Sequence, residues 1–119
     1  MREIKFRVWT TTEMQEVYNT EYKNGVLYAN NYPINDVTFY KLMQYTGLKD
    51  KNGKEIYEGD IIETKNWGNY RILWQDGHSG FRKMGTKSVS SSSFTHSIAL
   101  SSLVIGNTYQ TPGLLANNN

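Results

Sequence analysis

The residues best suited to chemistry lie in one glycine-rich segment in the middle of the chain. Asp50, Asn52 and Glu55 superficially match a calcium-binding loop. That pattern needs an acidic or amide ligand at its fifth position and glycine at its sixth. Lys54 stands at the fifth position and Gly53 comes too early. The sequence therefore predicts a tight turn at Asn52-Gly53 and no metal site.

Two carboxylates of the same segment, Glu58 and Asp60, flank Gly59. A carboxylate pair acts as general acid and base when its members face each other across a substrate cleft and have shifted pKa values. Carboxylates this close on a turn more often face water or cap the entry to a strand. The lysines of the segment are interpreted as a solvated loop face, not a phosphate site; they are Lys49, Lys51 and Lys54.

No nucleophile motif is present in the sequence. The two histidines, His78 and His96, lie in glycine- or serine-rich segments, and there is no cysteine. A Gly-x-Ser-x-Gly nucleophile elbow and a Gly-x-x-x-x-Gly-Lys-Ser/Thr phosphate loop are both absent. We therefore expect no enzyme activity, no catalytic residues and no cofactor.

Aromatic and basic side chains are the better functional candidates, because flat rings beside cations stack single-stranded nucleic acid or nucleotide-like ligands. Tyr70, Ile72 and Trp74 share one face of an expected strand, which favours a core position for Trp74. Tyr57 has core burial as its alternative, and Trp67 is expected to be exposed. The candidate binding residues are Tyr45, Tyr57, Lys65, Trp67, Tyr70 and Arg71.

Length and composition fit one small domain, or one domain with an appended subdomain, at 119 residues. Nine Tyr, four Phe and three Trp must supply much of the core, and exposed tyrosines would favour a homo-oligomer or ligand contacts. A net charge of +2 is weaker than nucleic-acid binders usually carry. The lack of cysteine suits a reducing cytoplasm, and no apolar run is long enough for a membrane segment or signal peptide.

Alternation of apolar and polar residues predicts short strands in the first part of the chain. Ile4, Phe6 and Val8 define the first, with a return strand at 14–18. Asn24-Gly25 between apolar flanks predicts a tight hairpin, and 30–33 is expected to break regular structure. Residues 37–45 favour a strand because they are β-branched and aromatic, with a short helix as the alternative.

The second part of the chain is also read as short strands with glycine at the corners. Strands are expected from Asp60 and from Tyr70, with a hairpin turn at Asp76-Gly77, and a last strand at 103–107. Residues 85–102 are rich in serine and predict a flexible loop, since such tracts bury little apolar area. The embedded Phe94, Ile98 and Leu100 argue against complete disorder there.

Three blocks of the sequence resemble the YopX family, small proteins found mostly in phages and prophages of low-GC bacteria. They are the opening residues 1–9, the central segment 44–62 with its Tyr-Thr-Gly-Leu-Lys-Asp-Lys-Asn-Gly run, and the closing residues 104–115 with Ile-Gly-Asn and Pro-Gly-Leu-Leu. The resemblance implies an SH3-like barrel after about residue 45, with the N-terminal hairpins beside it. It implies a lineage and a scaffold but no chemistry, and residues 85–102 have no counterpart in the family pattern.

The sequence thus predicts a mainly β protein with little helix. We expect an N-terminal β-hairpin region at 1–44, an SH3-like barrel at 45–115 with a serine-rich loop at 85–102, and a flexible tail at 116–119.

In function, we expect a phage-encoded, non-enzymatic binding protein of the host bacterial cytoplasm that modulates host machinery or host defence. It would inhibit a host protein or sequester a small nucleotide-like ligand. The alternatives are a nucleic-acid-binding accessory module and a structural, self-assembling phage protein. No membrane partner is expected.

Overall fold

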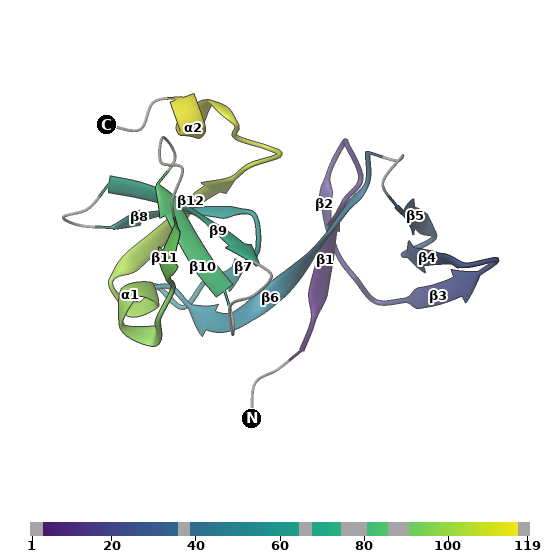
Figure 1. Ribbon diagram of the computed structural model, residues 1–119, viewed down its shortest axis with the longest axis horizontal. Coiled ribbons are helices and arrows are strands. Elements are labelled where there is room, and N and C mark those ends of the chain that lie inside the picture. The colour runs from purple at the N-terminus through teal and green to yellow at the C-terminus, as the bar shows by residue number, and fades with distance from the viewer. Residues whose placement is uncertain (1–3, 36–38, 65–67, 75–80, 86–90, 117–119) are drawn as a thin grey trace. The chain divides into compact units, whose positions relative to one another are not determined.

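The computed structural model describes residues 4–35, 39–64, 68–74, 81–85 and 91–116. Within these ranges the chain forms many short strands and two short helices, so the prediction of a mainly β protein is confirmed (Figure 1). The chain divides into two compact units, Met1–Tyr45 and Thr46–Asn119. In the described ranges, no helix has the length and apolar character needed to span a bilayer.

The first strands of unit 1 are β1 (Phe6–Trp9) and β2 (Met14–Glu16), joined by a tight turn in which Thr11 has φ 75°. β1 also pairs antiparallel with β6 (Lys41–Lys49). The segment 37–45, for which a strand or a short helix was predicted, is therefore a strand from Lys41 onward. The β-branched and aromatic side chains suit a pleated surface better than a helix.

Unit 1 also contains an antiparallel meander of β3 (Thr20–Lys23), β4 (Val26–Ala29) and β5 (Tyr32–Ile34), with β4 in the middle. The predicted hairpin at Asn24-Gly25 is confirmed: φ is 52° and 80° at these two residues. The predicted break at 30–33 is confirmed for Asn30 and Asn31, which have φ of 51° and 71° and make a second two-residue hairpin turn, but it is wrong for Tyr32 and Pro33, which lie in β5. Asparagine tolerates positive φ better than most residues.

Asn30 ties this meander to the end of β2. Its side chain is buried at 4% exposure. The Asn30 amide Nδ2 donates to the carbonyl of Glu16 at 2.9 Å and to Gln15 Oε1 at 3.2 Å, while Oδ1 accepts from the N–H of Tyr18 at 3.0 Å. One asparagine therefore satisfies three polar groups from a different part of unit 1.

Unit 2 is built on a five-stranded antiparallel sheet in the order β11-β10-β9-β8-β12 (Figure 1). A buried apolar cluster that includes Ile56, Ile62, Ile72 and Phe81 forms its core. Full burial of each such side chain contributes about 1.5–3 kcal/mol. The strands of this sheet are β8 (Asp60–Thr64), β9 (Gly68–Trp74), β10 (Phe81–Gly85), β11 (Ser91–Ser93) and β12 (Ser102–Asn107). Unit 2 also contains β7 (Glu55–Tyr57), α1 (His96–Leu100) and α2 (Gly113–Ala116).

The loop prediction for 85–102 is wrong for Gly85, which ends β10, and for much of 91–102, which contains β11, α1 and the start of β12, while 86–90 lie outside the described residues. Phe94 and Ala99 supply the buried area that the serines lack, at 8% and 0% exposure. Thr95 caps the helix by accepting from the N–H of Ile98. Small hydroxyl residues also favour turns and caps, so composition alone misjudged this segment.

The closing segment packs tightly onto β12 at Gly106. A Cβ at this position would lie 2.9 Å from Leu114 Cδ1 and would meet Thr111 as well. Asn107 shapes the intervening turn, since its Oδ1 accepts from the N–H groups of Tyr109 and Gln110. Ala116, the first residue of the predicted tail at 116–119, is the last residue of α2. Residues 117–119 and the predicted turn at 76–77 lie outside the described residues.

Candidate functional site

The Asp50 carboxylate holds a turn together and joins it to β12. Oδ1 accepts from the N–H groups of Asn52 and Lys54, each at 2.9 Å, and Oδ2 accepts from the N–H of Val104 at 2.9 Å. Gly53 has φ 84°, so the predicted tight turn at Asn52-Gly53 is confirmed. Asp50 is only 4% exposed, and both oxygens of its carboxylate accept hydrogen bonds from backbone N–H groups.

These bonds also set the protonation of Asp50. Burial by itself would raise the pKa of this carboxyl group. The hydrogen bonds from the N–H groups of Val104, Lys54 and Asn52 together outweigh burial and lower the pKa below its ordinary value of 3.8. The folded protein therefore holds Asp50 as the charged form.

Asp60 caps the entry to β8, as the strand-capping interpretation predicted. Its Oδ2 accepts from the N–H of Tyr57 at 2.7 Å, and Asp60 is 1% exposed. Gly59 between the two carboxylates has φ 89°, and its N–H donates to the carbonyl of Ile72 at 2.7 Å. The described residues contain no group of three or more histidine or acidic side chains placed to hold a metal ion.

The structure buries two of the six predicted binding residues. Tyr45 at the end of unit 1 is 3% exposed, and Tyr57 in unit 2 is 8% exposed. The ammonium of Lys5 lies 5.2 Å from the centre of the Tyr45 ring. Both tyrosines belong to the interior, so neither offers a ring face for a ligand. Tyrosine is amphipathic, and its type alone does not distinguish core from surface.

Tyr70 and Arg71 are adjacent in β9 and point to opposite faces of the sheet. Tyr70 is half-buried, and the Lys83 ammonium lies 4.5 Å above its ring centre. Burial, and secondarily the charge of Arg82, lowers the pKa of Lys83. Arg71 is exposed and donates from Nη2 to Met84 Sδ at 3.1 Å. The other two predicted residues, at 65 and 67, lie outside the described residues.

The core position expected for Trp74 is wrong. Trp74 is 44% exposed and rests edge-on against Phe81, with ring centres 5.2 Å apart. The predicted alternation along β9 is correct, but only Ile72, at 1% exposure, lies fully in the core. Trp74 is the last residue of β9, opposite Phe81 of β10.

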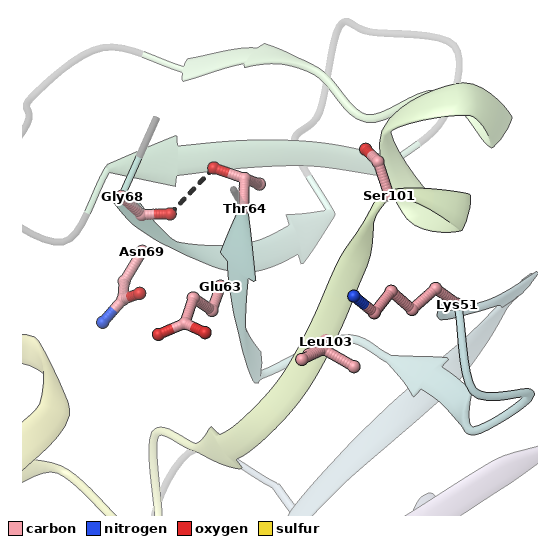
Figure 2. A pocket seen from close by; sticks show the side chains of 7 residues that line it. All are labelled: Lys51, Glu63, Thr64, Gly68, Asn69, Ser101 and Leu103. Atoms are coloured by element: carbon pink, nitrogen blue, oxygen red, sulfur yellow. Dashed lines mark hydrogen bonds between the residues drawn. The ribbon is translucent and has the colours of Figure 1, made fainter. Parts of the chain in front are cut away.

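A cleft of about 560 Å³, lined about equally by polar and apolar surface, lies at the ends of three neighbouring strands of unit 2. Leu103 on β12, Glu63 on β8 and Asn69 on β9 are paired across the strands and form one row on one face of the sheet. Figure 2 shows the Glu63 and Asn69 side chains extending in the same direction. The cleft is lined by Lys51, Glu63, Thr64, Gly68, Asn69, Ser101 and Leu103.

Local backbone bonds position the other polar groups of the cleft. The N–H of Lys51 donates to the carbonyl of Ser102 at 3.1 Å, which places the turn after β6 beside β12. Thr64 Oγ1 donates to the carbonyl of Gly68 at 2.9 Å and closes the end of β8 against β9 (Figure 2). Ser101 ends α1. The cleft is thus lined by an ammonium, a carboxylate, a carboxamide and two hydroxyls around one apolar side chain.

This arrangement suits recognition of a polar group by charge and hydrogen bonds. Ligand pockets for apolar small molecules are of similar volume but are lined mainly by hydrophobic side chains. Sequence reasoning had interpreted Lys51 as a solvated loop residue and had not considered Glu63 or Asn69. Their alternation with Ile62 and Tyr70 placed them on the solvent face, but only the strand register brings them together.

A smaller hollow of about 270 Å³ adjoins the cleft at Thr64. It is lined by Tyr70, Lys83 and Ile98 in addition to this threonine. Of the six predicted binding residues, Tyr70 therefore lines a concavity of the described chain. The Lys83 ammonium already covers one face of its ring.

These features describe a small, mainly β protein with a cleft at one end of its five-stranded sheet. The chain belongs to the YopX protein family, whose sequence pattern it matches over residues 5–116. It is also similar to the crystal structure of protein EF1440 from Enterococcus faecalis, with 29% sequence identity and a TM-score of 0.63. That similarity covers 97% of this chain and 99% of the other. No match is found among curated proteins.

Proposed function

We propose that this protein acts by binding, without catalysis, and that the cleft around Glu63 and Asn69 holds a polar group of its partner. The observation that carries this proposal is that some charged side chains are buried and bonded to the backbone, whereas others are exposed at the cleft. Asp50 and Asp60 are buried and accept backbone N–H groups. Glu63 and Lys51, in contrast, are exposed at the cleft. The carboxylates of Asp50 and Asp60 therefore support the fold, and Glu63 and Lys51 are charged groups exposed at the cleft.

The setting proposed for this binding is the cytoplasm of a host bacterium. The phage and prophage distribution implied by the family resemblance supports a role in modulating host machinery or host defence. The protein would inhibit a host protein or sequester a small nucleotide-like ligand. This part rests on lineage, since fold alone does not define function.

We further propose that unit 2 is an SH3-like barrel, a fold that mostly serves binding. Support comes from five antiparallel strands around one apolar cluster and from the shift in register between Val104 and Gly106 on β12. Such irregularities bend strands where small sheets curl. A high-resolution experimental structure tests the assignment: a flat, open sheet in unit 2 would contradict it.

The nucleic-acid alternative has less support than a protein or small-molecule partner. Two of its expected stacking residues, Tyr45 and Tyr57, are buried, and the Tyr70 ring lies under Lys83. A steep loss of affinity for DNA or RNA with rising salt would restore this alternative.

Reversing the charge of Lys51 should weaken partner binding by about tenfold or more, equivalent to about 1.4 kcal/mol. The matched control is Lys49→Glu, which makes the same charge change at an exposed residue of β6 that does not line the cleft. Affinity capture from host lysate, with quantitative mass spectrometry, compares wild type, Lys51→Glu and Lys49→Glu. We expect one host protein enriched by wild type and Lys49→Glu and depleted for Lys51→Glu.

A small-molecule partner would give a different result in a parallel measurement. A nucleotide-like ligand at 100 times its Kd should stabilise the protein by about 2.7 kcal/mol, and Lys51→Glu should reduce the resulting rise in Tm. Equal capture and equal thermal shifts for all three proteins would show that the cleft is not the site. Absence of any enriched protein or stabilising ligand would contradict the binding proposal itself.

A further inference from the structure

β3 is a short, exposed edge strand that contains neither proline nor a bulge. Its described neighbour is β4 alone, and all four of its residues are exposed, with Tyr22 at 74%. The opposite edge of the meander, β5, contains Pro33, whose missing N–H discourages pairing with another strand. β3 has neither proline nor a bulge, because its register with β4 runs unbroken from Thr20 to Lys23.

The backbone of β3 points its unused groups outward at Tyr22. In an antiparallel pair, residues alternate between hydrogen-bonded and non-hydrogen-bonded positions. The N–H of Asn30 donates to the carbonyl of Asn19 at 2.8 Å. Asn19, Glu21 and Lys23 therefore direct their backbone groups toward β4. Tyr22, between Glu21 and Lys23, directs its N–H and carbonyl to the open edge.

The charges on β3 are self-complementary about the same residue. Glu21 and Lys23 flank Tyr22 and form an ion pair at 2.9 Å within one chain, with side chains 50% and 61% exposed. We propose that β3 pairs antiparallel with β3 of a second copy of this chain, centred on Tyr22. This dimer is independent of the function proposed for the cleft, which lies in the other unit.

A two-fold axis at Tyr22 would pair the outward backbone groups of this residue with those of the second copy. Tyr22 of each copy would exchange its N–H and carbonyl with Tyr22 of the other. Glu21 would then stand opposite Lys23 of the second copy at a non-hydrogen-bonded position, where Cα atoms are about 4.5 Å apart and side chains interact most closely. Opposite charges and aromatic pairs at such positions are favourable, and like charges are unfavourable.

The strength of this dimer follows from its size. A four-residue edge is shorter than most stable interfaces, which bury about 1,200–2,000 Å² in total. The intrachain ion pair is also exchanged for intermolecular ones, so the charges determine which strand is accepted more than how tightly it binds. We therefore expect a reversible dimer that forms in the micromolar to millimolar concentration range.

Charge exchange between two variants tests the proposal directly. Glu21→Lys places two lysines on β3 and Lys23→Glu places two glutamates there, so each variant alone should dimerise at least about tenfold more weakly than wild type. Mixed in equal amounts, they should form a heterodimer, since every pair again joins opposite charges. Lys41→Glu, an exposed position of β6, is the matched control. Sedimentation equilibrium measures wild type, the three variants and the mixture.

Cysteine cross-linking supplies a second readout that does not depend on charge. The natural chain contains no cysteine, so Tyr22→Cys introduces a single thiol at the two-fold axis, within reach of a disulfide. It should cross-link much faster than Tyr18→Cys, placed at a tyrosine that is 80% exposed. A wild type that stays monomeric at millimolar concentration, a mixture of charge variants that fails to pair, or equal cross-linking rates would each overturn the proposal.

Discussion

Replacing Asp50 with alanine is expected to lower the free energy of unfolding by about 3–4 kcal/mol. The substitution leaves three backbone N–H groups, those of Asn52, Lys54 and Val104, without their acceptor. Hydrogen bonds to a charged group contribute about 1.5–3 kcal/mol each, although contributions within one network are not additive. Urea denaturation monitored by tryptophan fluorescence measures the difference.

Asp50→Asn serves as the isosteric control for this prediction. The asparagine Oδ1 can still accept from the turn, but its amide would present a donor to the N–H of Val104. We therefore expect about half of the alanine effect. A loss below about 1 kcal/mol for Asp50→Ala would contradict the role assigned to this carboxylate.

The same bonds predict a dependence of stability on pH. The pKa of Asp50 is lower in the folded protein than its ordinary value of 3.8. Its contribution to stability is therefore fully present above about pH 4–5 and is lost as the pH falls through the folded pKa. The difference in unfolding free energy between wild type and Asp50→Asn should shrink below pH 3.8.

Replacing Asn30 with alanine should destabilise the protein by about 3 kcal/mol. Alanine removes three side-chain hydrogen bonds, to Gln15, Glu16 and Tyr18, and it tolerates the φ of 51° poorly. Left-handed backbone disfavours a non-glycine residue by about 1–2 kcal/mol, asparagine less than most. Thermal and urea unfolding give the magnitude.

Asn30→Gly separates the two causes of this effect. Glycine keeps the positive φ without strain and loses the same side-chain bonds. It should therefore be less destabilising than alanine by about 1 kcal/mol. If alanine and glycine variants were both as stable as wild type, Asn30 would not anchor the meander to β2.

Turns were the part of the fold most accessible from the sequence. Asn24-Gly25 and Asn52-Gly53 both adopt positive φ at their glycines, as their local chemistry predicted. The same physics was present at Asn30-Asn31, but without glycine the pair was interpreted as a break. The local sequence thus predicted the two turns that contain glycine and missed the hairpin turn that is made by two asparagines.

Contacts between distant parts of the chain were not accessible in the same way. The bond from Val104 to Asp50 joins residues 54 positions apart, and nothing local marks either residue as a partner of the other. The cleft has the same origin, because its row of Leu103, Glu63 and Asn69 exists only in the register of three strands. Composition likewise misjudged residues 91–102, where two buried apolar residues, Phe94 and Ala99, accompany a polar majority.

The central claim is that Asp50 and Asp60, the two buried acidic residues of the family signature, support the fold, whereas partner recognition falls to the cleft. Amide hydrogen exchange at Val104, compared between wild type and Asp50→Asn, tests it most directly. The N–H of Gly59, which donates to the carbonyl of Ile72, is the internal control. We predict slow exchange of Val104 in wild type and at least about tenfold faster exchange in the variant, in excess of any change at Gly59. Equal exchange of Val104 in the two proteins would contradict the claim.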